Sequence, residues 1–301
     1  GSGKASLIAD SGSILDGGDS GGADLTAAQM RFSAGTGIGL LGEHADALEV
    51  TGGRLSAVSG SGGINLRHSG DLVVDAVAVS LSRVKTDGTL PAAADLVDLA
   101  WSDLTTGAGG SVVLVSMGSL TLNDGDGDFL AVSAGGTGNV LLQAGTTMTV
   151  SSGVFSGSGV LSLLAGAGDI TQGAQALLAT SGASIDVQAF AGAVTMIDGA
   201  RALSSGAGDV RYAARGDIRV GGIDAGSGNA SLVSTNGSIL DNGNTHGDVQ
   251  AVGLRLQAGA GIGELGSGQG ALEIAVATLA GAAGSGSISL YESNDVAVGG
   301  V

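Results

Sequence analysis

The sequence has no cysteine, and its three histidines, His44, His68 and His246, lie far apart along the 301 residues. A disulfide framework and a thiolate metal site are therefore excluded, and a zinc site is not expected. Proline occurs once, at Pro91, and aromatic residues make up 2% of the chain, whereas glycine occurs 59 times. A collagen helix would need a strict glycine period with abundant proline, and a disordered chain would not have a mean hydropathy of +0.40. The composition instead favours many tight turns around a core of small aliphatic side chains.

Basic residues are also scarce. The chain has 11 lysines and arginines against 28 acidic residues, which gives a net charge of −17. Nucleic acid is not an expected partner of so acidic a chain, and no basic cluster is present that would attract an anionic membrane. Apolar runs of roughly 18 residues are absent, so no membrane insertion is expected. The opening GSGKASLIAD is not a signal peptide, which indicates an internal or processed fragment.

A long internal repeat is visible in the sequence. Residues 1–18, GSGKASLIADSGSILDGG, return 225 residues later as GSGNASLVSTNGSILDNG, and DLTAAQMRFSAGTGIG at residues 24–39 returns as DVQAVGLRLQAGAGIG at residues 248–263. Residues 1–225 are therefore interpreted as one full unit, and residues 226–301 as the start of a second unit continuous with it. We call residues 1–71 the first copy and residues 226–295 the second copy.

A shorter period of 20 to 28 residues runs inside the unit. Each block has a glycine-rich turn, an alternating apolar strand, a small turn and a second alternating strand. The alternation directs one set of side chains inward, such as Val187 and Tyr212, and sets polar neighbours such as Asp186 and Arg211 outward. The leading apolar residues of successive blocks are predicted to be Val112, Val140, Val160, Ile185, Val210 and Ala230.

One such block cannot bury its own apolar row. Stacked blocks join these rows into one core and let each strand pair in parallel with the coils above and below it. With coils of about 22 residues, the sequence predicts an all-β fold, a right-handed parallel β-helix (solenoid) of roughly 13 or 14 coils with one irregular insert. A leucine-rich horseshoe is the alternative parallel array, but its asparagine-anchored leucine consensus is missing.

The pattern breaks between Leu81 and Gly109. This 81–109 insert contains the only proline and the only tryptophan, Trp101. Its apolar residues have mixed spacings, so a short helix against the rod and a protruding loop are both compatible with it. Trp101 is a candidate partner contact because aromatic side chains dominate interface hot spots, and packing beneath its own loop is the equal alternative.

The densest acidic cluster is NDGDGDF, in which Asp124, Asp126 and Asp128 alternate with glycine. Calcium prefers carboxylate ligands, so these three residues are the candidate calcium site. Short Asp/Gly runs are also ordinary turn chemistry, and the EF-hand and tandem nonapeptide patterns are absent. A similar turn contains Asp16, Asp19 and Asp24, with Asn244 replacing Asp19 in the second copy.

No catalytic residue and no other cofactor are predicted. Parallel β-helix enzymes that act on polysaccharides need clustered carboxylates on one face, whereas the acids here are scattered at corners. Charged residues recur at matched positions of the two copies, and this recurrence indicates a structural role, because a catalytic site is usually single. Such pairs are Asp16 and Asp241, Arg31 and Arg255, and Glu49 and Glu273.

The blocks TAAQMRFSAGTGIGLLGEHADALEVTGGRL and INLRHSGDLVV resemble the repeats of giant bacterial exoproteins, the filamentous-haemagglutinin-like adhesin family. The shared pattern is apolar-x-Leu-x-Ala-Gly-x-Gly-Ile-Gly, then a Leu-Glu site, Gly-Gly-Ile-x-Leu and a Gly-Asp-Leu turn. The resemblance implies a right-handed parallel β-helix, export to the bacterial cell surface, and a role as stalk, filament or adhesin.

The main hypothesis is therefore a structural segment of a secreted bacterial surface fibre, stalk or adhesin that self-associates along the rod axis. An open end of a β-helix presents unpaired strand edges, which favours such stacking. The alternative is a binding module that recognises a glycan or surface protein through the 81–109 insert. A third hypothesis is a polysaccharide-acting enzyme.

Overall fold

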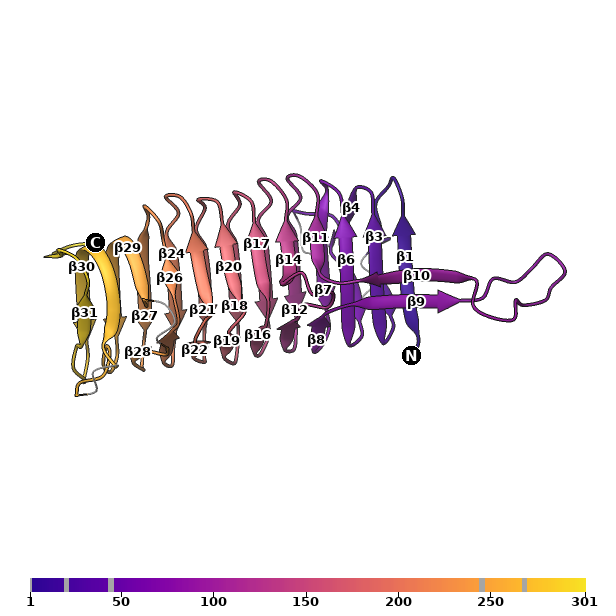
Figure 1. Cartoon of the computed structure of the whole chain (residues 1–301). Coiled ribbons are helices and arrows are strands. Elements are labelled where there is room, and N and C mark those ends of the chain that lie inside the picture. Colours follow the sequence, from indigo (N-terminus) through magenta and orange to yellow (C-terminus); the bar gives the residue numbers. More distant parts are fainter. Residues whose placement is uncertain (1, 19–21, 43–45, 244–246, 267–269) are drawn as a thin grey trace.

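The computed structural model describes residues 2–18, 22–42, 46–243, 247–266 and 270–301. Every regular element in these ranges is a β-strand, and the strands stack into a rod of about 11 turns (Figure 1). The predicted all-β parallel solenoid is confirmed, and its right-handed coiling stays a prediction. Four residues considered in the sequence lie outside the described ranges: Asp19, His44, Asn244 and His246.

Three parallel ladders of strands run along the rod. The first contains β1 (Lys4–Ala9), β3 (Gln29–Ala34), β6 (Arg54–Ser59), β11 (Leu104–Thr106), β14 (Leu130–Ala134), β17 (Gly153–Ser156), β20 (Leu177–Thr180), β23 (Arg201–Ser204), β26 (Ile223–Asp224), and the first halves of β29 (Val249–Ala258) and β30 (Leu272–Ala283).

The second ladder contains β4 (Gly37–Ile38), β7 (Gly63–His68), β12 (Val112–Ser116), β15 (Val140–Ala144), β18 (Leu161–Ala165), β21 (Ile185–Ala189), β24 (Val210–Ala214), β27 (Asn229–Ser234), the second halves of β29 and β30, and β32 (Ala297–Val298). The third contains β8 (Leu72–Val74), β13 (Leu120–Leu122), β16 (Met148–Val150), β19 (Ile170–Gln172), β22 (Val194–Met196), β25 (Ile218–Val220) and β28 (Ile239–Asp241). Shorter strands β2 (Leu25–Thr26), β5 (Leu48–Thr51) and β31 (Leu290–Glu292) pair with β5, β7 and β30.

The predicted inward and outward alternation holds at β21 and β24. Val187 and Tyr212 are fully buried partners in adjacent coils. Asp186 and Arg211 point outward beside them and form an ion pair with an N–O distance of 2.6 Å. Inward rows of this kind join along the whole rod into one continuous core.

One predicted leading residue, Val160, is wrong by a single position. Leu161 is the partner of Val140 and of Ile185 and is fully buried, whereas Val160 is 41% exposed. The local sequence VLSLL alternates equally well in either phase, and a shift by one residue exchanges the two faces of a strand. Only pairing with the neighbouring coils decides between the phases.

The rod has about 11 turns rather than the 13 or 14 coils that the sequence predicts. Many coils are longer than the assumed average: 25 residues separate Met30 from its partner Leu55, and 25 separate Ile185 from Val210. In addition, the irregular insert leaves the coil altogether and adds no turn.

The insert is an antiparallel hairpin of β9 (Val77–Leu81) and β10 (Leu96–Trp101). The chain leaves the coil at Val77 and is back in it at β11, so the 81–109 bounds and the short-helix interpretation are wrong. The hairpin lies along the rod over β6, β3 and β1, and its tip extends beyond the first coil, near the amino terminus (Figure 1). Val77 and Val79 are buried, and Lys4 Nζ donates to the Ala78 carbonyl at 3.1 Å. These contacts tie the hairpin base to the rod.

The two copies have the same internal pairing but lie on different ladders. Lys4 pairs with Gln29, and the matched residue Asn229 pairs with Gly253. However, β1 belongs to the first ladder, whereas its counterpart β27 belongs to the second. Matched surface positions of the two copies therefore lie on different ladders of the rod.

Candidate functional site

The predicted calcium ligands lie in the turn between β13 and β14. The Asp124 carboxylate accepts backbone N–H bonds from Gly127 at 2.6 Å, Phe129 at 3.0 Å and Asp126 at 3.2 Å. The hydrogen bond from the Gly127 N–H is the main cause that lowers the pKa of the Asp124 carboxyl. Asp128 likewise accepts a bond from the backbone of Leu130. The Asp124 carboxylate thus stabilises the turn by accepting backbone hydrogen bonds, as aspartates in short Asp/Gly runs commonly do.

Asp126 and Asp128 come together with Asp103 rather than with Asp124. One carboxylate oxygen from each of the three lies within 4.8 Å of the others. Asp103, just after the hairpin, has a φ of 66° and is 6% exposed. The sequence pattern did not single out this residue because it lies outside the acidic run. Calcium binding at this cluster stays a prediction.

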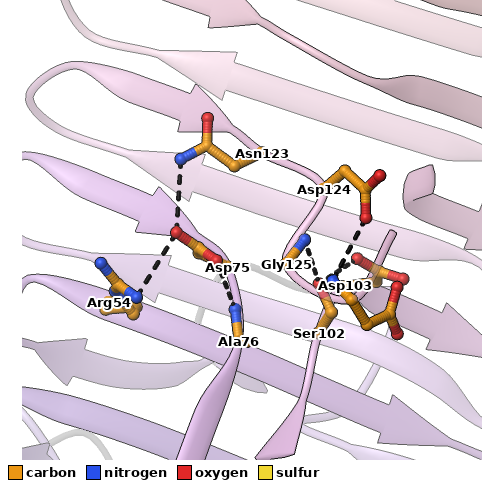
Figure 2. Close-up of polar contacts among 9 residues, drawn as sticks. Arg54, Asp75, Ala76, Ser102, Asp103, Asn123, Asp124 and Gly125 are labelled. Atoms are coloured by element: carbon orange, nitrogen blue, oxygen red, sulfur yellow. Dashed lines mark hydrogen bonds and ion pairs between the residues drawn. The ribbon is translucent and has the colours of Figure 1, made fainter. Parts of the chain in front are cut away.

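Hydrogen bonds hold Asp103 in place (Figure 2). Ser102 Oγ donates to its Oδ1 at 2.5 Å and accepts a bond from the Gly125 backbone at 2.9 Å. Burial raises the pKa of Asp103 to about 7, and the negative charges of Asp128, Asp126 and Asp124 oppose its ionisation further. Asp75, also drawn in Figure 2, differs because it has a cationic partner, Arg54, at 3.4 Å.

Trp101 packs on its own rod. The Cζ atom of Arg31 lies 3.8 Å from the centroid of the indole ring, and Arg31 is 4% exposed. The matched residue in the second copy, Arg255, is exposed and bonds to Gln257. The hairpin therefore accounts for the burial of the first arginine. The insert also has exposed apolar side chains, in the segment between its strands and in the strands themselves: Val84 and Leu90, and Leu81, Val97 and Leu99.

Two of the recurring acids belong to a carboxylate cluster in each copy. In the second copy Asp241 ends β28, Asp248 directly precedes β29, and Glu273 lies in β30 on the next coil. One carboxylate oxygen from each lies within 4.8 Å of the others, and we call these residues the second-copy triad. The same distance limit holds for the matched first-copy triad, which consists of Asp16, Asp24 and Glu49.

Each triad has the same backbone contacts. Asp248 Oδ2 accepts the Glu273 N–H at 2.8 Å, and Asp24 Oδ2 accepts the Glu49 N–H at the same distance. Asp241 and Asp16 each accept the N–H of the glycine two residues later at 2.9 Å. These bonds account for the structural role expected from recurrence. They involve the carboxylates of the aspartates and only the backbone N–H of the glutamates.

The triads differ in burial. Asp248 is fully buried because the preceding coil covers it, with the Ile223 N–H bonded to the Asp248 carbonyl at 2.8 Å. Asp24 is exposed. Burial raises the pKa of Asp248 far above its usual range, and the negative charges of Asp241 and Glu273 raise it further.

A groove lies beside the glutamate of each triad. In the second copy its lining includes Glu273, Gly247, Ala275 and Tyr291, and in the first copy the matched residues Glu49, Ala23, Thr51 and Arg67. The second groove also contains Arg201, Asp224 and Gln250. Each groove therefore lies against the glutamate of its triad, and neither aspartate of the triad lines it.

Searches of protein-family models, curated protein sequences and solved structures find no match to this chain. In the described part of the chain, no helix has the length and apolar character needed to cross a membrane.

Proposed function

We propose that this chain is a structural rod segment of a bacterial surface fibre or stalk, and that it associates end to end with further coils of the same kind. The proposal rests on how completely the core side chains are covered at the two ends of the rod. Leu7, Ile14 and Leu25 at one end, and Leu279 and Leu290 at the other, are only partly covered, whereas interior residues are fully buried.

A further coil on either end would complete the structure in two ways. It would cover these apolar side chains, which favours association by the hydrophobic effect. It would also pair the free backbone groups of the terminal strands, which otherwise form an open sheet edge. Both gains are the same interactions that stack the coils inside the rod.

Charge acts against this association. Each chain carries a net charge of −17, so rods repel each other over a distance set by the ionic strength. End-to-end contact is therefore expected to strengthen as salt screens the repulsion. Export to the bacterial surface, which the family resemblance implies, completes the proposal.

Electron microscopy and sedimentation of the purified chain test the proposal at about 0.05 M and 0.5 M salt. We expect filaments one rod wide, longer at the higher salt. Leu7→Lys places a charge on the partly covered core end and is expected to leave single rods. Ile8→Lys is the matched control, because Ile8 is already 50% exposed, and it should behave as the parent chain does. Monodisperse single rods of the parent chain at both salt concentrations would refute the fibre.

A second candidate function rests on the hairpin tip. Val84 and Leu90, in the segment that joins β9 to β10, are 62% and 61% exposed, and Leu81 at the end of β9 is 48% exposed. Exposed apolar patches on a projecting element mark interaction sites. The tip therefore favours a module that binds a surface protein or glycan, and this function would remain if the microscopy showed only single rods.

A further inference from the structure

We propose that the second-copy triad, Asp241, Asp248 and Glu273, binds a calcium ion that links two adjacent coils. This site is separate from the acidic turn at Asp124, Asp126 and Asp128. It is also independent of end-to-end association, because all three ligands belong to one chain.

The first line of evidence is an unsatisfied charge. Asp248 is 0% exposed, and its Oδ1 has no hydrogen-bond partner. Glu273 Oε2 is likewise buried without a partner. A buried carboxylate oxygen without a donor destabilises the folded state, so such groups are normally paired or coordinate a metal.

The second line of evidence is that no ion pair among the described residues neutralises the triad. Those ion pairs join Arg54 to Asp75 and Arg211 to Asp186. Three carboxylates so close together repel one another unless a proton or a cation lies between them. A divalent cation would satisfy the buried oxygens of both Asp248 and Glu273.

The chemistry of the group favours calcium over other metals. All the available ligands are oxygens, which suits the hard cations Ca²⁺ and Mg²⁺ rather than zinc or copper. Calcium accepts irregular sets of six to eight oxygens, whereas magnesium demands a near-ideal octahedron. The groove beside Glu273 would admit the water molecules that complete the coordination.

The recurrence of the triad supports a site rather than an accident of one turn. Asp16, Asp24 and Glu49 repeat the residue types and the backbone bonds in the first copy. There Asp24 is exposed, so water can solvate its charge and the demand for a cation is weaker. We therefore expect the second-copy triad to bind calcium more tightly than the first.

Calcium titration of the purified chain by isothermal calorimetry, at low salt where end-to-end association is expected to be weakest, tests the site. We expect a dissociation constant of about 10⁻⁴ to 10⁻³ M, the range of extracellular calcium modules. Asp248→Asn keeps the acceptor for the Glu273 N–H but removes the charge, and it should weaken binding by at least about tenfold. Glu273→Gln is a second variant that leaves the backbone bond intact and should do the same. Asp10→Asn is the control, because Asp10 is exposed and belongs to none of the carboxylate clusters, and it should bind calcium as the parent chain does.

Terbium provides a local readout. Tyr291 is the strand partner of Glu273, so a terbium ion at the triad should show tyrosine-sensitised luminescence. Tyr291→Phe should abolish the emission without changing calcium affinity, because the hydroxyl is not a ligand. We expect calcium to displace the bound terbium, and we expect magnesium at the same concentration not to displace it.

Three results would each overturn the assignment. The first is no calcium binding at 10-fold above the expected range, which would mean that a shared proton neutralises the triad. The second is calcium affinity that is unchanged in both Asp248→Asn and Glu273→Gln. The third is displacement of terbium by magnesium as effectively as by calcium. None of these results depends on whether the rods polymerise.

Discussion

At the residue scale, the close spacing of stacked coils requires glycine at the coil corners. A Cβ atom on Gly138 would lie 2.0 Å from the Gly110 carbonyl oxygen, and one on Gly159 would lie 2.1 Å from the Gly138 oxygen. Buried hydroxyls close the same corner, since Ser156 Oγ donates to the Gly138 carbonyl at 2.8 Å. The corner therefore has room for a hydrogen atom but not for a methyl group.

We predict that Gly138→Ala destabilises the rod by about 1–3 kcal/mol, because the new methyl group must push two coils apart. The measurement is the urea midpoint of unfolding followed by circular dichroism. Gly12→Ala is the matched control, because a Cβ there meets no atom within 4 Å. Equal midpoints for the two variants would contradict the close approach.

Asp103 makes stability depend on pH. Its pKa of about 7 in the folded chain lies above its ordinary value, so the folded state holds the proton more tightly than the unfolded state does. Its contribution to stability is therefore present at low pH and is lost as pH rises from about 4 to about 7.

We predict that Asp103→Asn is more stable than the parent chain at pH 8 by about 1–2 kcal/mol, a value reduced for partial solvent screening. The difference should disappear near pH 4, where the parent carboxyl is protonated. Urea unfolding at both pH values measures it, with exposed Asp10→Asn as the control. A stability difference that does not change with pH would show that Asp103 ionises normally.

At the element scale, the hairpin is attached to the rod by its base and free at its tip. Trp101 is the partner of Val77 in the hairpin and stacks on Arg31 of β3. A stacked guanidinium and indole contribute about 1–2 kcal/mol when they are shielded from water. This contact and the buried Val77 and Val79 determine whether the hairpin stays on the rod.

We predict that Trp101→Ala loosens the hairpin without unfolding the coils. Hydrogen exchange by mass spectrometry should show about a tenfold loss of amide protection over residues 77–101, and no change from β12 to β25. Arg31→Ala should have the same effect, whereas the matched Arg255→Ala should have none because that arginine is exposed. Unchanged hairpin exchange in Trp101→Ala would show that the valines alone hold it.

At the scale of the whole molecule, the rod is a one-dimensional array in which each coil contacts its neighbours. The shift of the second copy from the first ladder to the second changes what each copy presents to solvent. The hairpin covers Arg31 on the first ladder, and Arg255 is uncovered on the second. Similar sequences in one rod can thus have different environments.

The sequence by itself determined the architecture. Alternation of apolar and polar residues, glycine at the corners and the block period are local properties, and stacking is the arrangement that lets each block bury its apolar row. The inward positions of Val187 and Tyr212 and the turn role of Asp124 follow from such local patterns.

Only the tertiary structure decided the features that depend on contacts between distant residues. The phase of Leu161 required its neighbouring coils, since the local alternation has two solutions. The hairpin depended on antiparallel pairing and on the rod surface beneath it. Asp103 joined the acidic turn from the insert, and Asp248 became a buried charge because a preceding coil covers it, whereas Asp24 at the matched position of the first copy stays exposed. Burial and proximity of charges are properties of packing, and a local sequence pattern does not specify them.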